Sequence, residues 1–315
     1  MNHWEYRQIS LKYHLSDWLL FSAYLPLQVC SERLGSGTVP TAAVMEPEQK
    51  LEGDRQGFMI RGLPVIAELP AISRSENYLF YMSSQYCHCY IDLGIGFEAY
   101  KQKFSAKTRS TINRKIRKYQ DSCGGNILWK SYQSPEEIRE FFQLARAVSK
   151  LTYQERLLNA GLPDTEEFIR DAEQLAAEQR LRAYLLFDGE KPVSYLYCPV
   201  HDEVLIYAYL GYDPAYMQLS VGTVLQWLAL EALFAERRFR YFDFTEGQSD
   251  HKRLFATHQQ QCANVLILRK SLKNYLIVYS HRSLEIFSGW LGEILERFGL
   301  KAKIKRLLRF GSQGA

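Results

Sequence analysis

The sequence predicts an α/β fold of the mixed (α+β) type, with helices packed on a sheet of parallel and antiparallel strands. The first observation is the order of segments between residues 134 and 270: two helices, three strands, a loop, a helix, a strand, a turn and a strand. The second is the aromatic content of 14%, which is typical of packed sheets and ligand clefts. The third is the length, since 315 residues correspond to about two domains.

The first part of the chain predicts strands and short helices. Residues 1–97 contain short apolar runs separated by Gly, Pro and Ser, and residues 40–57 are polar enough for a loop. The first ten residues, MNHWEYRQIS, lack a basic head followed by an apolar core, so we expect no signal peptide. No apolar run is long enough to span a bilayer, and we expect a soluble, cytoplasmic protein.

A basic helix is expected at residues 98–121. Between residues 101 and 118 it carries eight basic residues and no acidic one. These side chains form either a solvated helix face or an anion-binding surface for phosphate, RNA or an acidic glycan. The CGG sequence at 123–125 ends the helical pattern, and we place a domain boundary near residue 125.

The second part of the chain begins with a helix start signal. Ser134 suits the N-cap, Pro135 the first helical position, and Glu137 completes a capping box. A second helix follows, capped by Asp164 or Thr165. Strands are expected at 181–189, 191–202, 203–214, 240–247 and 261–270, with a loop and a long helix at 217–239.

Six cysteines are scattered through the chain, unlike a disulfide framework. Cys87, His88 and Cys89 place two thiols on one face of a strand, but no second ligand pair stands at zinc-finger spacing. We therefore expect buried free thiols and no metal. The net charge of +4 is too small to indicate nucleic-acid binding by itself.

The loop before the long helix is the expected anion site. Gly222 lets the backbone approach a ligand closely, and the amides of residues 221–224 open a helix N-terminus that would hold a diphosphate. The other interpretation is a tight strand-to-helix turn that Ser220 merely caps.

Three segments carry a family resemblance: LTYQERLLNAGLPDTEEF, YLGYDPAYMQLSVGTVLQWLALEAL and RRFRYFDFTEGQSDHKRLFA. Together they resemble the GNAT superfamily, and more closely the CelD/BioF2-like group related to FemAB transferases. The resemblance covers residues 98–270 well and the first hundred loosely. It implies two tandem GNAT-like units: a degenerate half at 1–125 and an acyltransferase domain at 126–270, followed by a helical tail at 271–315.

The resemblance also implies a donor, acetyl-CoA or another acyl-CoA, whose pyrophosphate the loop would wrap. Val221 stands where such proteins usually have proline, and the ordinary GNAT glycine signature is incomplete. The implied cofactor-binding residues are Gln218, Leu219, Ser220, Val221, Gly222 and Thr223.

The implied catalytic lysine is Lys252, which would stabilise the oxyanion formed when an amine attacks a thioester or ester. Asp243 either orients this lysine or accepts backbone hydrogen bonds. Candidate bases are Asp213, Glu246 and His251, because a carboxylate or imidazole can take the amine proton. Tyr209 could protonate the leaving thiolate, although packing in an aromatic sheet is the alternative.

The acceptor is expected near Tyr153, Gln154 and Asp213. We expect a primary amine on an amino sugar, an amino acid or a cell-envelope or polysaccharide precursor. Three alternatives stay open: a FemAB-type transferase using aminoacyl-tRNA, which the basic helix would suit, an O-acyltransferase on exopolysaccharide, and a non-catalytic binding protein. The oligomeric state is left open.

The tail at 271–315 predicts a further helical pair, with Lys301, Lys303 and Arg306 among its basic residues. This basic amphipathic pattern would suit peripheral contact with an anionic membrane, such as the inner face of the cell membrane. Docking on the chain's own domain, with the basic residues in solvent, is the alternative.

Overall fold

The computed structural model describes residues 4–15, 18–35, 37–51, 53, 55–152, 155, 161–247 and 249–297. The chain forms two compact units. Unit 1 combines Met1–Tyr86 with Gln261–Ala315, and unit 2 is the continuous stretch Cys87–Gln260. Strands β5 (Tyr78–Asp92) and β12 (His258–Arg269) each run from one unit into the other. Helices and mixed strands confirm the predicted α/β class, whereas the three-part division at 125 and 270 stays a prediction.

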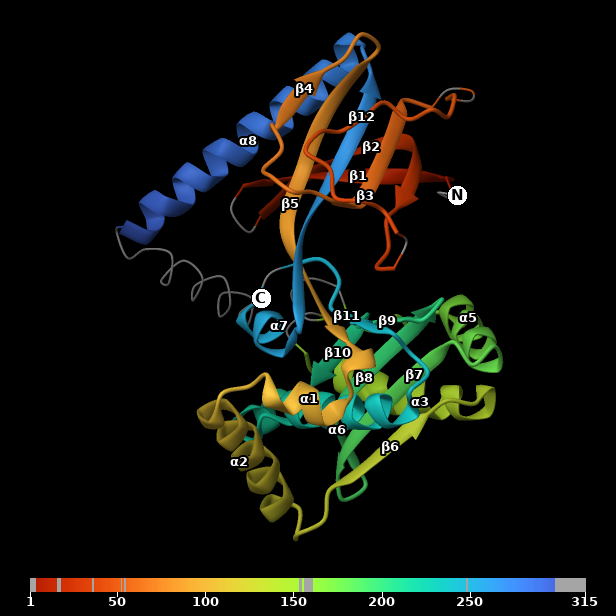
Figure 1. Ribbon diagram of the computed structural model, residues 1–315, viewed down its shortest axis with the longest axis vertical. Helices are drawn as coiled ribbons and strands as arrows, with labels where there is room; N and C mark the ends of the chain where they lie inside the picture. Colours follow the sequence, from red (N-terminus) through yellow and green to blue (C-terminus); the bar gives the residue numbers. More distant parts are fainter. Residues whose placement is uncertain are drawn as a thin grey trace, which may run out of the picture. The chain divides into compact units, whose positions relative to one another are not determined.

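Unit 1 is a sheet covered by one long helix (Figure 1). β1 pairs antiparallel with β2, β2 parallel with β3, and β3 antiparallel with β12, while β4 pairs antiparallel with β5. Inward side chains, including Leu25, Leu27, Tyr81 and Leu266, form a core with Val278 of helix α8. The bounds are β1 (Glu5–Leu15), β2 (Trp18–Ser31), β3 (Gly57–Pro64), β4 (Ile72–Arg74) and α8 (Leu272–Arg297).

Unit 2 begins with two helices where the sequence predicts one. After the short η1 (Leu93–Ile95), α1 (Phe97–Gln102) ends at Lys103 and α2 (Ala106–Ser122) starts again. The break arises because the Ser105 side chain accepts a hydrogen bond from the Thr108 amide and caps the second helix. The prediction of one helix over 98–121 was therefore wrong at this point.

The sheet of unit 2 has the order β6, β7, β8, β9, β11, followed by the end of β5. All neighbours are antiparallel except β9 and β11, which are parallel. β10 pairs only with β8 among the described strands. The bounds are β6 (Leu128–Tyr132), β7 (Leu181–Asp188), β8 (Lys191–His201), β9 (Val204–Ile206), β10 (Tyr209–Tyr212) and β11 (Tyr241–Asp243).

Helices cover both faces of this sheet. In β7, Leu181, Ala183 and Leu185 pack against α3 and α5, whereas Tyr184 and Leu186 face the core that contains α6. This alternation is the two-residue period of a strand buried on both sides. The bounds are α3 (Pro135–Ser149), α5 (Glu166–Ala177), η2 (Pro214–Leu219), α6 (Val221–Glu236) and α7 (Asp250–Phe255).

Two predicted helix starts are confirmed. Ser134 and Glu137 form the capping box of α3, with Pro135 in its first turn. Of the two candidates for α5, Thr165 is the N-cap, and its side chain accepts from the Phe168 amide. Among the described residues, no helix is both long and apolar enough to cross a membrane.

Candidate functional site

The strand predicted at 203–214 is broken in the middle, and the break opens the candidate site. β9 ends at Ile206, where the Tyr207 amide donates to the Asp243 carbonyl oxygen of β11 at 2.8 Å. The next amide, of Ala208, turns to Tyr197 of β8 at 3.3 Å. β10 then continues along β8 alone, so the chain leaves β11 after the short parallel pairing of β9 with β11. The prediction of one continuous strand was wrong here.

A pocket of about 290 Å³ lies beside this separation. Four of the six predicted cofactor-binding residues line it, Ser220 to Thr223, whereas Gln218 and Leu219 are not in its lining. His251 reaches the pocket from α7. The remaining lining residues are Tyr207, Leu210, Tyr212 and Met217.

The loop leads into α6 through a left-handed residue. Ser220 has φ 55° and ψ 37°, and its side chain makes no capping hydrogen bond. Its carbonyl accepts from the Thr223 and Val224 amides at 2.9 and 3.1 Å. Within the described chain, the amides of Val221 and Gly222 have no hydrogen-bond partner. The helix thus presents two free donors and the positive end of its dipole at the pocket.

Gly222 serves the packing of α6 on β10. A Cβ at this position would lie 3.3 Å from both Leu210 Cδ2 and Tyr212 Cδ1, closer than side chains normally pack. The glycine therefore brings the helix N-terminus against β10, whose Leu210 and Tyr212 also line the pocket. The structure thus shows a close approach of helix to strand at Gly222, whereas the close approach to a ligand stays a prediction.

The basic helix α2 contacts the same loop. Lys118 Nζ donates to the Gln218 carbonyl oxygen at 3.0 Å, and α2 packs against η2 and α6. Lys115 is close enough to His251 to help lower its pKa. Positive charge from α2 therefore reaches the surroundings of the pocket.

His251 is held neutral. Its Nε2 lies 2.7 Å from the Gln226 side-chain oxygen, and its ring packs on Phe255. Burial, with smaller contributions from Lys115 and Lys252, lowers the pKa of His251 to about 4. At neutral pH the imidazole is therefore uncharged, and it can accept a proton at one ring nitrogen.

Lys252 belongs to a second cluster. Its Nζ donates to the Glu246 carbonyl oxygen at 2.6 Å. Burial lowers the pKa of Lys252, and the charge of nearby Asp243 partly offsets this. The Glu246 side chain itself is exposed. The structure thus brings Lys252, Asp243 and the backbone of Glu246 together, whereas His251 points into the pocket.

Asp243 is buried, and one of its two carboxylate oxygens has two partners. Its Oδ1 lies 2.5 Å from His88 Nε2 and accepts from the Thr245 amide at 2.6 Å. His88 comes from β5, where Cys89 is buried and its pKa is raised to about 11, mainly by burial. In the described part of the chain, no three His, Cys, Asp or Glu side chains gather to hold a metal. The CHC segment therefore supplies a histidine partner for Asp243.

The other candidates lie elsewhere. Tyr209 packs against Phe168 and Tyr197 on the face opposite the pocket. Asp213 accepts from the Ala215 amide and pairs with Lys191 at 2.8 Å. Although burial opposes it, these hydrogen bonds lower the pKa of Asp213. Tyr153 and Gln154 lie outside the described residues, as does the tail from residue 298.

Sequence reasoning missed two residues of the site. Gln226 is a fully buried polar side chain between Leu225 and Trp227 in a strongly apolar helix, and that contrast was the available signal. Tyr207 lines the pocket, but its position depends on the strand break, which the continuous apolar run conceals.

Residues 106–253 match the sequence family described as Acetyltransferase (GNAT) domain. This match, on a mixed sheet with separating strands and a helix N-terminus at a pocket, defines an acyltransferase class. The chain carries a GNAT acetyltransferase domain, which confirms the predicted superfamily and the prediction of an enzyme. No curated protein matches the chain significantly.

Solved structures with similar folds have low sequence identity. L-PGS from Bacillus licheniformis is 14% identical over 72% of both chains, with a TM-score of 0.44. FemX is 9% identical over 87% of this chain and 90% of its own, with a TM-score of 0.47. An aminoglycoside acetyltransferase from a soil metagenome, solved with sisomicin, is 16% identical over 41% and 84%, with a TM-score of 0.31.

Proposed function

We propose that this protein transfers an acyl group from acetyl-CoA or a longer acyl-CoA to a primary amine. The observation that carries the proposal is the pocket beside the separated strands, lined by Ser220 to Thr223 and by His251. A thioester donor with an anionic end needs hydrogen-bond donors for its phosphates and apolar side chains for the rest of the molecule, and this pocket offers both.

The donor's phosphates suit the start of α6. The free amides of Val221 and Gly222 and the helix dipole favour an anion. Lys115 and Lys118 of α2 add positive charge nearby. The apolar part of the donor suits Leu210, Tyr212 and Met217, which also line the pocket.

In the proposed reaction the neutral amine attacks the thioester carbonyl, a C–N bond forms, and the C–S bond breaks. The amine loses one proton and the leaving thiolate gains one. His251 is the pocket residue able to accept the proton, because it is neutral at pH 7. Lys252 would supply positive charge for the oxyanion after a small movement away from the Glu246 carbonyl.

The acceptor class stays a proposal from the family resemblance: an amino sugar, an amino acid or a cell-envelope precursor. Tyr153, Gln154 and Asp213 remain proposed acceptor contacts, with Asp213 held by Lys191. Transfer to a hydroxyl would use the same pocket, and a protein that binds the donor without turnover is the remaining alternative.

An aminoacyl-tRNA donor is the second candidate, and the exposed basic face of α2 favours it. Arg114, Arg117 and Lys118 are exposed on this helix, which contacts the loop before the pocket. A polyanion spread along α2 would place its reactive end toward His251. Such binding falls steeply with salt because each phosphate contact releases counterions.

A thermal-shift titration separates these candidates. We expect acyl-CoA to raise the melting temperature of the wild type, because a ligand of the folded state stabilises it. Thr223→Glu places a carboxylate in the first turn of α6, where the dipole tolerates it but phosphate is repelled. Thr223→Gln is the matched neutral control. We expect the shift to disappear in Thr223→Glu and persist in Thr223→Gln.

If no acyl-CoA raises the melting temperature of the wild type, the CoA proposal fails. Binding of aminoacyl-tRNA that weakens in Arg114→Gln/Arg117→Gln and falls with salt would then support the second candidate. Donor binding without product on a panel of amines and alcohols would instead support the non-catalytic alternative.

A further inference from the structure

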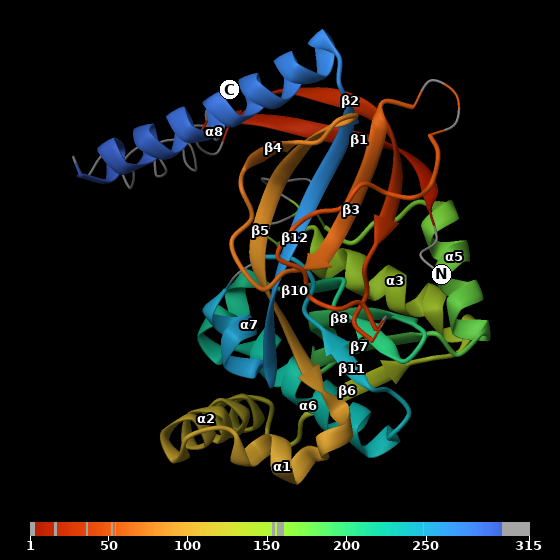
Figure 2. The same cartoon turned by 45° about the horizontal axis from the view of Figure 1, so that its top comes forward.

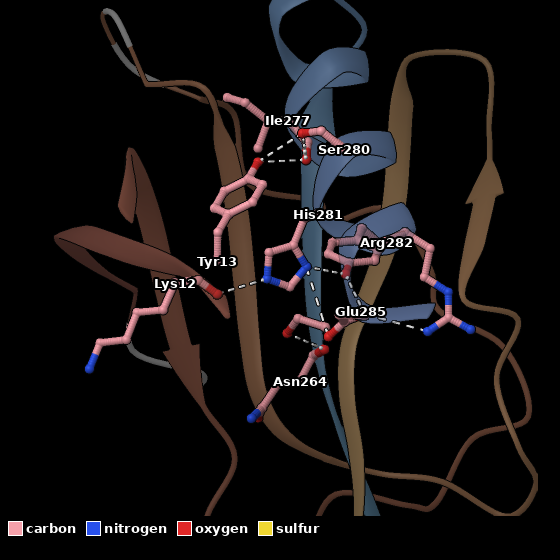
Figure 3. A network of polar contacts seen from close by, with 10 residues as sticks. Lys12, Tyr13, Asn264, Ile277, Ser280, His281, Arg282 and Glu285 are labelled. Atoms are coloured by element: carbon pink, nitrogen blue, oxygen red, sulfur yellow. Dashed lines mark hydrogen bonds and ion pairs between the residues drawn. The ribbon is translucent and has the colours of Figure 1, made fainter. Parts of the chain in front are cut away.

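Helix α8 has two opposite faces, one packed on its own unit and one exposed. One face is anchored to the sheet of unit 1, and Figure 3 shows the network that anchors it. Tyr13 donates its hydroxyl hydrogen to the Ile277 carbonyl at 2.9 Å, and His281 Nε2 lies 3.1 Å from the Lys12 carbonyl. Since a carbonyl only accepts, Nε2 is the donor in this contact. Nδ1 lies 2.6 Å from the Tyr81 hydroxyl oxygen, and that hydroxyl also donates to Glu285 Oε2 at 3.1 Å.

The other face carries a stripe of exposed, mostly apolar side chains, which we call the α8 stripe. Its members recur at alternating intervals of four and three residues, the spacing of a helix-pairing seam. Isolated apolar residues on a surface are normal, but a continuous row over this length marks an interaction site. The stripe consists of Leu272, Leu276, Tyr279, Ser283, Ile286 and Trp290.

The exposure along this stripe is large. Leu272 is 78% exposed, Leu276 63%, Ile286 60% and Trp290 57%. Phe287 beside the stripe is 48% exposed and packs against Trp290. In Figures 1 and 2 the last part of α8 extends beyond the strands of unit 1.

The sequence of the stripe is self-complementary when reversed. Consider two copies of α8 that lie antiparallel about a twofold axis, which crosses the stripe at the level of His281 along the helix. Leu272 then faces Trp290, and Leu276 faces Ile286. Tyr279 then faces Ser283, so the large ring meets the smallest side chain of the row. A twofold interface requires this kind of reciprocity.

The charges favour the same arrangement. Lys270 and Lys273 are exposed at the start of α8, and Glu293 is exposed near its end. Antiparallel pairing brings Glu293 beside the basic start of the second helix, where the helix dipole also favours a carboxylate. Parallel pairing would instead place like charges together. Arg282 near the axis is paired with Glu285 of its own helix at 3.4 Å.

We propose that the α8 stripe binds the α8 stripe of a second copy of this chain, antiparallel, to form a twofold dimer. The proposal rests on unit 1 alone and is independent of the donor. Sedimentation of the full chain over a concentration series tests it first. We expect the mass of two chains for the wild type. The mass of one chain at every concentration would overturn the proposal.

Complementary charge variants test the register. Leu276→Lys and Ile286→Glu should each dissociate the dimer, weakening it at least about 10-fold, because each buries a lone charge. Mixed together, they should restore a dimer, since Lys at 276 then faces Glu at 286. Leu276→Lys mixed with Trp290→Glu should not, because those positions are not opposite. These residues are exposed, so unchanged circular dichroism will report intact folding.

Met45→Glu is the matched control, because Met45 is 81% exposed in unit 1 but lies outside α8. It should stay dimeric, and dissociation equal to that of Ile286→Glu would overturn the proposal. Vesicles of anionic phospholipid test the rival occupant. If the wild type is monomeric and floats with the vesicles, and Ile286→Glu does not, the stripe is a membrane contact and the proposal fails.

Discussion

His251 and Gln226 form one hydrogen-bonded pair, with Nε2 of the imidazole 2.7 Å from Oε1 of the amide. An amide oxygen only accepts, so Nε2 carries the proton and Nδ1 is the basic nitrogen. Gln226 is fully buried and cannot swing away without breaking the packing of α6. The pair therefore fixes both the tautomer and the direction of the ring that lines the pocket.

The first prediction concerns pH. The pKa of His251 is about 4 in the folded protein, below its ordinary value of 6.5. As pH falls, the unfolded chain takes up this proton first, so stability is lost from about pH 6.5 down to about pH 4. Because His251 is partly exposed, we expect the free energy of unfolding to fall by about 1–2 kcal/mol over this pH range. His251→Gln should lack this slope in denaturant unfolding at pH 7, 5.5 and 4; parallel curves for the two proteins would contradict it.

The second prediction concerns Lys252, which lies outside the pocket lining while its neighbour His251 is inside. If Lys252 stabilises the oxyanion, Lys252→Met should lower kcat by about 100-fold or more. The thermal shift with the donor should remain. Arg253→Met is the control, since Arg253 is exposed and its ion pair among the described residues is with Asp250, three residues earlier on the same helix. Loss of donor binding in step with activity would assign Lys252 to binding instead.

The third prediction concerns the backbone of Ser220. Its φ of 55° lies in the left-handed region, which glycine adopts without strain. Because the side chain makes no capping hydrogen bond, Ser220→Gly should raise the free energy of unfolding by about 1 kcal/mol. Ser220→Ala keeps the Cβ and should bring no gain. An equal gain in both variants would show that the hydroxyl, and not the backbone, carries the cost.

The fourth prediction concerns the β3–β12 pairing. A Cβ on Gly57 would lie 2.1 Å from the Ile267 carbonyl oxygen and 2.8 Å from Leu268 Cα. Both are backbone atoms that cannot move alone, so Gly57→Ala should destabilise unit 1 by about 3 kcal/mol. Gly292 in α8 has open space around its missing Cβ, and Gly292→Ala should stabilise the helix by up to about 1 kcal/mol. Thermal unfolding of both variants and the wild type tests this, and equal melting temperatures for the three proteins would contradict it.

Local signals were enough to predict much of the fold. The capping box at Ser134 and the cap at Thr165 place two helices, because those contacts lie within four residues of each other. The start of α6 at Ser220 to Thr223 was located the same way, from small residues between a strand and an apolar helix.

Long-range partners could not be predicted this way. Tyr207 and Tyr209 would share one face of a continuous strand, but the break at Ala208 sends them to opposite faces. His88 and Asp243 stand 155 residues apart, so only the fold joins them. His251 and Lys252 are neighbours on a helix and therefore point in different directions, which separates two roles that the sequence had placed together.

The division of the chain also has a consequence for its biosynthesis. Unit 2 is continuous and complete once Gln260 has emerged from the ribosome, whereas β3 of unit 1 waits for β12, which the ribosome makes later. We expect stalled nascent chains to show protease protection of unit 2 before unit 1, and simultaneous protection would contradict this order. Until β12 is made, the backbone N–H and C=O groups on one edge of β3 lack this partner and could pair with a strand of another chain.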